Sequence, residues 1–268
     1  MDMAKELALI GCGNMGSAIA KGVVSSGLVA PRDLVVADVS EASQKRLAAE
    51  LGCAGTCDNV EAVSGAKMVL IAVKPQYLDD AVSAFAHAVD EGAIVVSIAA
   101  GVSLERLEGL LGAGRKIVRV MPNLAATVLA AMSSLSPNAN VSEDETDQVK
   151  RIFDALGRAE VVPEHLIDAV IAASGSSPAY VCVFIEALAD AAVAEGMPRA
   201  QAYTFAEQAV LGTAKYLLET GTHPAVLKDM VSSPAGTTIE AVAALERGGM
   251  RAAVIDAARA AAAKNRAM

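Results

Sequence analysis

Basic residues are scarce in this chain, and acidic residues outnumber them. Of its 268 residues, 22 are Lys or Arg and 31 are Asp or Glu, which gives a formal net charge of −9, and the basic residues form no stripe. A surface that binds the phosphates of nucleic acid needs an excess of Lys and Arg. We therefore expect no nucleic-acid partner.

Cysteine and histidine are scarce as well. No C-x-x-C pair and no matching Cys/His pair occurs, so we expect no metal site and no disulfide. The simplest interpretation is that the thiols are reduced and buried, which fits a reducing cytoplasm. The histidines are isolated from one another and nothing resembles a Ser/His/Asp arrangement, so we assign no catalytic histidine. The cysteines are Cys12, Cys53, Cys57 and Cys182.

Long apolar runs are missing. The stretches 68–73 and 93–102 are far shorter than the ~20 residues that a membrane span needs. The apolar run 181–194 carries Glu186 and Asp190. The segment MDMAKELALIGCGNMG has acids and glycines where a secretion signal has basic residues and a continuous apolar stretch. We expect a soluble, cytoplasmic protein with no membrane contact.

The first 160 or so residues alternate short apolar runs, rich in Val and Ile, with amphipathic segments. Such runs are typical of parallel strands that are buried on both faces. We expect strands at 6–10, 34–38, 68–73, 93–98 and 116–121, and further strands at 131–136 and 159–162. We expect helices at 15–26, 41–51, 59–64, 78–88, 104–111 and 143–156. This alternation predicts right-handed βαβ units and an α/β fold with a doubly wound sheet.

After Pro163 the sequence shows only helical patterns. We expect helices at 164–173, 178–195, 199–219, 225–231, 238–247 and 251–263. The change predicts two domains, a dinucleotide-binding domain at 1–162 and an all-helical domain at 163–268. The helix at 178–195 is apolar around most of its circumference and requires burial on all sides. Because a second subunit would provide that burial, we expect a homo-oligomer.

A G-x-G-x-x-G motif follows the first expected strand directly. Glycines at this position allow a tight turn and let a pyrophosphate approach backbone N–H groups at a helix N-terminus. The context of strand, motif and helix therefore predicts a bound dinucleotide. The motif consists of Gly11, Cys12, Gly13, Asn14, Met15 and Gly16.

Asp38 ends the second expected strand, about 20 residues beyond the motif, where an acid hydrogen-bonds the ribose hydroxyls of NAD. The 2′-phosphate of NADP would meet a like charge there, and Val39 stands where an NADP enzyme often has Arg. Lys45 and Arg46 either bend back toward the cofactor or belong to a solvated helix face. The sequence thus favours NADH over NADPH. Lys74 follows the strand 68–73. It either reaches the cofactor or, with Pro75, simply ends the strand.

A small polar loop, Ser232–Gly236, precedes the helix expected at 238–247. Thr237 and Glu240 predict a capping box with Thr237 as the N-cap. Such a helix start offers N–H groups and hydroxyls to an anion, and a substrate carboxylate fits that chemistry. The alternative is a capped loop without a ligand.

Five motifs along the chain coincide with those of one enzyme family. They are G-C-G-N-M-G-S-A-I at the start, A-V-K-P-Q at 72–76, M-P-N at 121–123, S-G-S-S-P-A-Y at 174–180 and D-M-V-S-S-P-A-G-T-T at 229–238. Through them the sequence resembles pyrroline-5-carboxylate reductase. The resemblance implies NAD(P)H-dependent reduction of the cyclic imine 1-pyrroline-5-carboxylate to L-proline. It also implies a Rossmann domain followed by a helical domain that interlocks in a homodimer, which in many members assembles further into decamers.

The resemblance implies roles for individual residues. The residues expected at the substrate are Glu164, Ser233, Gly236, Thr237 and Thr238. Those expected at the cofactor, beside the glycine motif and Asp38, are Asn59, Val73, Lys74 and Pro75. Thr238 is expected nearest the chemistry, since its hydroxyl can hydrogen-bond the ring nitrogen. The chain departs from the family pattern at Leu124, where the family has Thr, and at Ser177 and Ala235, where it has Gly.

Two alternatives remain open. The β-hydroxyacid dehydrogenase group also begins with such a glycine motif and ends in helices, but it uses a Lys in the first long helix of its second domain. The corresponding helix here, at 178–195, contains no Lys. A non-catalytic NAD-binding sensor is the second alternative, although a sensor would not need to keep the substrate loop that ends at Thr238.

Overall fold

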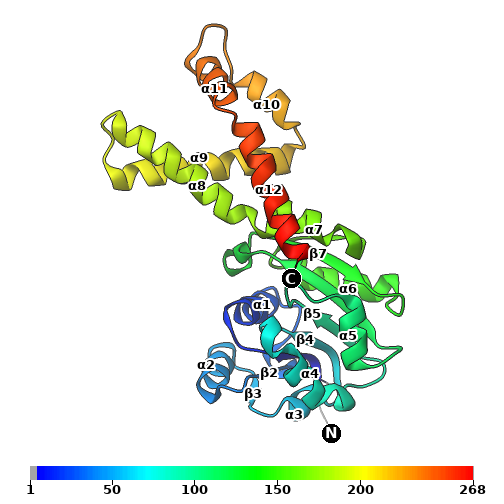
Figure 1. The fold of residues 1–268 in the computed structure, drawn as a ribbon. Coiled ribbons are helices and arrows are strands. Elements are labelled where there is room, and N and C mark those ends of the chain that lie inside the picture. Colours follow the sequence, from blue (N-terminus) through cyan, green and yellow to red (C-terminus); the bar gives the residue numbers. More distant parts are fainter. Residues whose placement is uncertain (1–4, 268) are drawn as a thin grey trace. The chain divides into compact units, whose positions relative to one another are not determined.

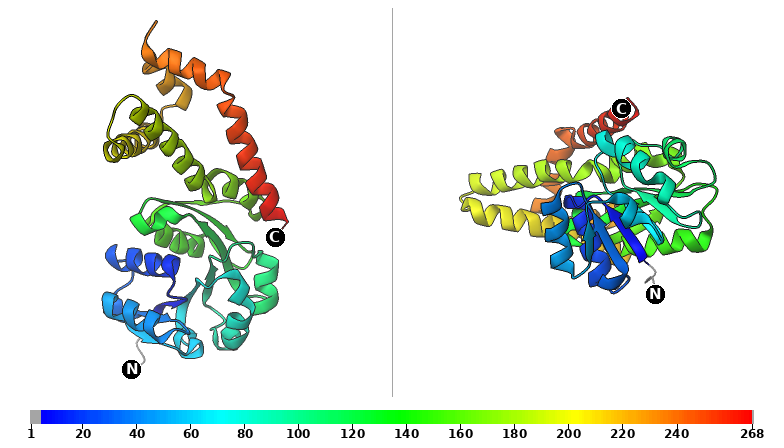
Figure 2. Two further views of the ribbon diagram at one scale, coloured as in Figure 1. Left: turned by 60° about the vertical axis from the view of Figure 1, so that its left-hand side comes forward. Right: turned by 90° about the horizontal axis from the view of Figure 1, so that it is seen from below.

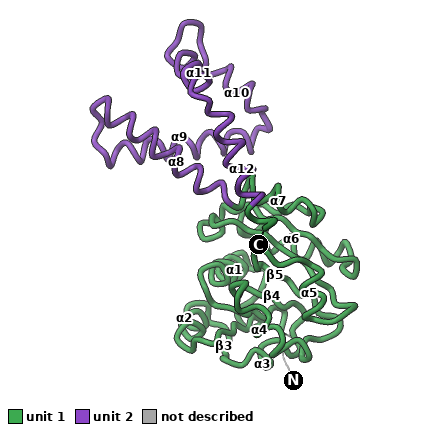
Figure 3. The backbone as a smooth tube through the Cα atoms, in the orientation of Figure 1, with its two compact units in different colours: residues 1–175, 264–268 green, residues 176–263 purple. Residues whose placement is uncertain are grey.

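The structure is a computed structural model that describes residues 5–267 (Figure 1). The chain forms two compact units (Figure 3). The first unit runs to Gly175 and includes the segment from Lys264 onward, and the second unit is Ser176–Ala263. The predicted domain boundary at 162/163 follows the change from strands to helices, and it stays a prediction.

The first unit is built on an eight-stranded sheet with the order β3-β2-β1-β4-β5-β6-β7-β8. Neighbouring strands are parallel except for the antiparallel pair β6 and β7. The predicted α/β doubly wound sheet is therefore confirmed. The sequence missed β3, whose three residues include no long apolar side chain. The strands are β1 (Lys5–Ile10), β2 (Leu34–Ala37), β3 (Ala54–Thr56), β4 (Ala66–Ile71), β5 (Ile94–Ser97), β6 (Lys116–Pro122), β7 (Ala131–Pro137) and β8 (Gly157–Val161).

Helices cover both faces of this sheet (Figures 1 and 2). One buried cluster joins the sheet to α1, α2 and α6, and a second joins the opposite face to α3, α4 and α5. The helix expected at 78–88 ends at Phe85 and continues as a single 3-10 turn. The helices are α1 (Asn14–Ser25), α2 (Glu41–Leu51), α3 (Asn59–Val63), α4 (Leu78–Phe85), α5 (Leu104–Leu111) and α6 (Glu143–Asp154).

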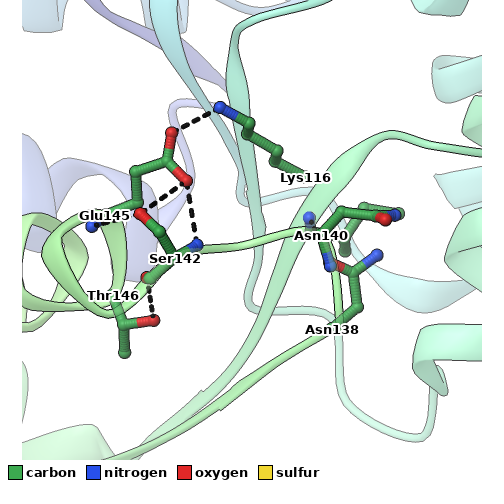
Figure 4. Close-up of polar contacts among 7 residues, drawn as sticks. Lys116, Asn138, Asn140, Ser142, Glu145 and Thr146 are labelled. Atoms are coloured by element: carbon green, nitrogen blue, oxygen red, sulfur yellow. Dashed lines mark hydrogen bonds and ion pairs between the residues drawn. The ribbon is translucent and has the colours of Figure 1, made fainter.

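A polar cluster fixes α6 to the start of β6 (Figure 4). Lys116 Nζ lies 2.5 Å from Oε1 of Glu145, whose other carboxylate oxygen accepts the N–H of Ser142 in a capping box. Asn138 Oδ1 accepts the N–H of Ile117 at 3.2 Å, so the amide ties the end of β7 to β6. Because these groups satisfy one another, the cluster serves the fold and leaves no vacant ligand position.

Among the described residues, the region after β8 contains helices joined by loops and no strand, which confirms the predicted all-helical second part. The helix expected at 164–173 is instead a 3-10 turn at Glu164–Leu166, the short helix α7 (Ile167–Val170) and a π-helical turn at Ile171–Gly175. Next come the helices α8 (Ser177–Ala194), α9 (Arg199–Thr220), α10 (Pro224–Met230), α11 (Thr237–Arg247) and α12 (Met250–Arg266).

The helices of the second unit leave many apolar side chains exposed on the single chain. Only three residues of α8 and α9 are buried, and all three are alanines. By length and composition alone, the helical stretch Glu164–Ala194 could cross a membrane, and 6% of its most apolar window is buried. Large apolar residues that are more than half exposed include Val183, Phe205, Leu211, Leu218 and Met230.

Candidate active site

A cavity of about 480 Å³ lies in the first unit beyond the carboxyl ends of β1, β2 and β4. Each of these strands is followed directly by residues that line it: Gly11 after β1, Asp38 after β2 and Ala72 after β4. This edge of a doubly wound sheet is where such folds bind dinucleotides. The complete lining is Ile10, Gly11, Gly13, Ala37, Asp38, Val39, Asn59, Ala72, Val73, Lys74, Tyr77, Asp80, Ala81 and Ala84.

The three glycines of the motif have different physical roles. Gly11 has φ +105°, and a Cβ atom there would lie 2.7 Å from the carbonyl oxygen of Ala72. A Cβ on Gly16 would lie 2.1 Å from the carbonyl oxygen of Gly11, so this glycine lets α1 pack closely on the strand end. A Cβ on Gly13 would meet nothing within 4 Å. Gly13 therefore keeps the cavity open for a ligand, whereas the other two shape the loop itself.

Asp38 is tied to the backbone on both sides of its strand end. Its Oδ2 accepts the N–H of Cys12 at 2.7 Å, and its Oδ1 accepts the N–H of Ser40 at 2.8 Å. Each carboxylate oxygen has two acceptor positions, so capacity remains for ribose hydroxyls in the cavity. Asp38 thus braces the glycine-rich loop in addition to lining the cavity.

Asn59 and Lys74 provide further polar groups in the same cavity. Oδ1 of Asn59 is buried and has no hydrogen-bond partner among residues 5–267, which suits a ligand hydroxyl or amine. Lys74 is the one basic residue of the described chain that lines the cavity, and two carboxylates, Asp38 and Asp80, line it too. The open space beside Gly13, the unpartnered Oδ1 of Asn59 and the ammonium group of Lys74 fit an adenine dinucleotide.

Six of the predicted cofactor residues line the cavity, namely Gly11, Gly13, Asp38, Asn59, Val73 and Lys74. The other five lie around it. Asn14 begins α1, Met15 packs against the core, and Pro75 begins the 3-10 turn Pro75–Tyr77. Cys12 and Gly16 are buried beneath the loop.

Lys45 and Arg46 pair with acids of their own helix, although the Arg46 charge still acts on the Cys12 thiol in the cofactor loop, where it partly offsets the rise in pKa that burial causes. Lys45 pairs with Glu41 at 2.5 Å, and Arg46 lies 3.7 Å from Glu50. Both pairs lie along α2 itself and are exposed, as expected for a solvated helix face.

Sequence reasoning missed the far wall of the cavity. Tyr77, Asp80, Ala81 and Ala84 line it from the segment that forms α4, at the spacing of one helical face. The opposite face carries the buried residues Leu78, Val82 and Phe85. The sequence shows this helical spacing, but the spacing identifies cavity residues only once the residues that follow β4 are known to border the cofactor site.

The Cys12 thiol lies beneath the cofactor loop and is expected to be unreactive. Burial, followed by the nearby Asp38 carboxylate, raises the pKa of Cys12 to about 12, so the thiol stays protonated well above neutral pH. We expect iodoacetamide at pH 8 to modify the exposed Cys57 and to spare Cys12, as read by peptide mass mapping. The variant Cys57→Ser should lose the adduct on residue 57. Labelling of Cys12 at a rate similar to that of Cys57 would contradict the expectation.

The other thiols correct the sequence analysis in part. Burial also raises the pKa of Cys53. The expectation that all four thiols are buried holds for Cys12 alone, since Cys53 is half-buried and Cys57 and Cys182 are exposed in the single chain.

The predicted substrate loop forms a tight turn in the second unit. The N–H of Gly236 donates to the carbonyl oxygen of Ser233 at 3.0 Å, and a Cβ on Gly236 would lie 2.3 Å from the Ser233 hydroxyl oxygen. The hydroxyl is therefore seated against the turn, directly before α11. The first N–H groups of α11, those of Thr237 and Thr238, have no acceptor within the helix.

The capping box predicted here is wrong. Gly236 is the N-cap of α11, in extended backbone with φ −82° and ψ 169°, and no side chain caps the helix. The helix begins one residue earlier than the pattern suggests, so Thr237 is already helical and its hydroxyl is not in the N-cap position. Glu240 is consequently one position too late for the reciprocal bond.

Glu164, the fifth predicted substrate residue, lies in the first unit. Its Oε1 accepts the Leu104 N–H at 2.7 Å, at the start of α5, and lies 2.8 Å from the buried Arg119 guanidinium on β6. One carboxylate oxygen is thus committed to holding the 3-10 turn, α5 and β6 together. A role toward substrate would fall to the other oxygen.

Comparisons with known proteins cover nearly the whole chain. A family model described as pyrroline-5-carboxylate reductase dimerisation matches residues 164–268, and one described as NADP oxidoreductase, coenzyme F420-dependent, matches residues 6–101. The chain is 50% identical to the pyrroline-5-carboxylate reductase of Escherichia coli (strain K12) over 95% of both proteins. It is 46% identical to that of Methanosarcina acetivorans over 94% of both.

Solved structures agree with these relatives. A pyrroline-5-carboxylate reductase from Coxiella burnetii superposes with a TM-score of 0.94 at 32% identity, covering 98% of each chain. A pyrroline carboxylate reductase from Plasmodium falciparum with NADP bound gives a TM-score of 0.84 at 28% identity, covering 98% of this chain and 97% of that one.

The match to a dimerisation family also accounts for the exposed apolar helices of the second unit, because a partner subunit buries such surfaces. It supports the expected oligomer. The family resemblance expected from the motifs is confirmed, and the chain belongs to the pyrroline-5-carboxylate reductase family.

Proposed function

We propose that the protein reduces 1-pyrroline-5-carboxylate to L-proline, the final step of proline biosynthesis, with NADH as its preferred reductant. The observation that carries the proposal is that one family member has both a dinucleotide cavity at the sheet edge and a turn that keeps Ser233, Gly236, Thr237 and Thr238. The bound nicotinamide supplies the hydride. The carbon of a protonated C=N bond accepts hydride readily, so the protein mainly has to bind and orient the substrate.

The turn before α11 is suited to the substrate carboxylate. Since the Gly236 N–H is already used to close the turn, the Thr237 and Thr238 N–H groups and the Ser233 hydroxyl remain as donors to an anion. The Thr238 hydroxyl is then the group placed to hydrogen-bond the ring nitrogen. Glu164 stays a proposed substrate residue, and Oε2 is the oxygen available to it, because Oε1 accepts the Leu104 N–H and pairs with Arg119.

A turnover assay tests the proposal. Purified protein with NADH should oxidise the cofactor when 1-pyrroline-5-carboxylate is added, and the product should be L-proline. Turnover of open-chain hydroxy or keto acids without turnover of the imine would favour the hydroxyacid dehydrogenase alternative. Binding of NADH without any turnover would favour a sensor.

Asp38 carries the proposed preference for NADH. The cavity presents two carboxylates, Asp38 and Asp80, against one ammonium group, and the nearest basic residues of α2 pair with acids of their own helix. A 2′-phosphate beside Asp38 would meet an uncompensated like charge, which costs a few kcal/mol at an effective dielectric of roughly 20. We expect a lower KM for NADH than for NADPH in steady-state assays.

The matching variant is Asp38→Ser with Val39→Arg, which should shift the preference toward NADPH. Because Asp38 also accepts the Cys12 and Ser40 N–H groups, the variant should in addition lower Tm. Asp38→Asn removes the charge and keeps one of the two bracing hydrogen bonds, so its Tm should fall less than that of the double variant. A tenfold preference of the unmodified protein for NADPH would refute this interpretation of Asp38.

We further propose an obligate homodimer, with decamers as the larger assembly, working in the cytoplasm. The exposed apolar side chains of α8 and α9 support the dimer, and four free thiols fit a reducing compartment. Sedimentation at micromolar concentration should show no species of 27.2 kDa, the mass of one chain. A stable and active monomer would contradict the proposal.

A further inference from the structure

Ala235 has an unusual backbone conformation for its residue type. Its φ is +56°, and it is one of two non-glycine residues with positive φ in the described chain. In this region the Cβ atom of an L-residue crowds its own backbone, so glycine adopts it readily and alanine does not. The outlier lies in the middle of the turn that precedes α11, the segment assigned above to the substrate carboxylate.

The turn requires this conformation. Ser233 and Gly236 close it through a 3.0 Å hydrogen bond, Pro234 occupies its second position and Ala235 its third. A turn with Pro in the second position and positive φ in the third has type II geometry, which favours Gly or Asn at the third position. Any relaxation of Ala235 toward negative φ would open the turn.

Opening the turn would disturb the proposed substrate donors. The Ser233 hydroxyl oxygen lies within 2.3 Å of where a Gly236 Cβ would be, and the Ser233 carbonyl oxygen lies within 3.1 Å of it. The two residues are therefore packed on each other immediately before α11. A changed φ at Ala235 would rotate Gly236 away and separate the Ser233 hydroxyl from the N–H groups of Thr237 and Thr238.

We propose that Ala235 is a positioning residue that sets the affinity for the imino acid through the conformation of this turn. The inference rests on the proposed role of the turn in holding the substrate. With alanine at this position, a fraction of the free protein holds the turn open, and only the closed fraction binds. The apparent dissociation constant rises by the inverse of the closed fraction. Ala235 thereby affects KM and leaves the hydride-transfer step unchanged.

Substitutions at position 235 test the proposal. The order of the variants by their tolerance of positive φ differs from their order by side-chain size. Ala235→Gly should lower KM for the imine, and the dissociation constant of L-proline measured by calorimetry, by up to about tenfold, with kcat within twofold. Ala235→Asn should also lower both constants, since Asn tolerates positive φ. Ala235→Val should raise both, because β-branched residues tolerate positive φ least.

The contrary results are equally specific. If affinity follows side-chain volume, so that Asn binds more weakly than Ala, the methyl group acts by direct contact and the proposal is overturned. Equal constants for Gly and Ala would overturn it as well. Leu129, the other residue with positive φ at +57°, provides the control: Leu129→Asn should change Tm and leave KM unchanged.

The proposed function has a separate test within the same experiment. If the unmodified protein turns over no imine, the proposed function fails, whatever the series shows. If the protein is active and Ser233→Ala leaves KM unchanged, the turn is not the substrate site. If Ser233→Ala raises KM while the 235 series is flat, only the inference about Ala235 fails.

Discussion

Replacing Gly11 by alanine is expected to unfold part of the cofactor edge and to abolish dinucleotide binding. The native φ of +105° costs an alanine about 1–2 kcal/mol, and the new Cβ would lie 2.7 Å from the backbone oxygen of Ala72, an overlap that typically costs about 1–3 kcal/mol. Since this oxygen belongs to the backbone that follows β4, it cannot move aside as a flexible side chain would. Together these costs correspond to a fall in Tm of roughly 5–20 °C.

Gly13→Ala is the matched control. Its φ is −70° and a Cβ there meets no atom within 4 Å, so calorimetry should show a much smaller fall in Tm than for Gly11→Ala, limited to the cost of alanine at the N-cap of α1. The methyl group would occupy space in the cavity beside the proposed pyrophosphate, so the affinity for NADH should still fall. A loss of stability in Gly13→Ala as large as that in Gly11→Ala, or normal NADH binding in Gly11→Ala, would contradict the roles assigned to the two glycines.

Thr238→Ala is expected to lower kcat for the imine by ten- to a hundredfold. The hydroxyl is the side-chain group that we place at the ring nitrogen, and a hydrogen bond that strengthens as the nitrogen becomes an amine stabilises the transition state more than the ground state. One charge-assisted bond of roughly 1.5–3 kcal/mol corresponds to that loss. NADH binding, measured by fluorescence titration, should not change, because the cofactor cavity is formed by the first unit alone.

Two controls accompany this variant. Thr238→Ser keeps the hydroxyl and should restore most of kcat. Thr237→Ala removes a hydroxyl that caps nothing, since Gly236 is the N-cap, so stability should be retained after loss of a neighbouring hydroxyl in the first turn of α11. Wild-type kcat in Thr238→Ala together with a defect in Ser233→Ala would mean that the proton comes from solvent or from an already protonated imine.

The sequence predicted the sheet well because its strands are buried on both faces and therefore read as continuous apolar runs. The strand Ala54–Thr56 escaped because an edge strand of small residues has no such run. Helix starts were harder to place: the same letters T-T-I-E fit a capping box with Thr237 as N-cap, and only the hydrogen bond from Gly236 to Ser233 shows that the helix begins there.

The candidate site was predictable to the extent that it depends on local motifs. The glycine motif and Asp38 could be placed because strand, turn and helix follow one another along the chain. The wall formed by Asp80 and Ala84 could not, because those residues reach the cavity through tertiary packing of α4. Likewise, no sequence pattern reveals that Asp38 accepts the Cys12 N–H or that Ala235 has a positive φ.

The exposed apolar side chains of α8 and α9 bear on how the enzyme matures in the cell. Pairing of two chains is a second-order process, so its rate falls with the square of the concentration of free subunits. At low expression, each new chain would spend longer as a single subunit with Phe205, Leu211 and Leu218 in water. Such a subunit is a substrate for chaperones and proteases. Enzyme level should therefore rise more steeply than synthesis rate, so that a modest drop in expression depletes active protein disproportionately.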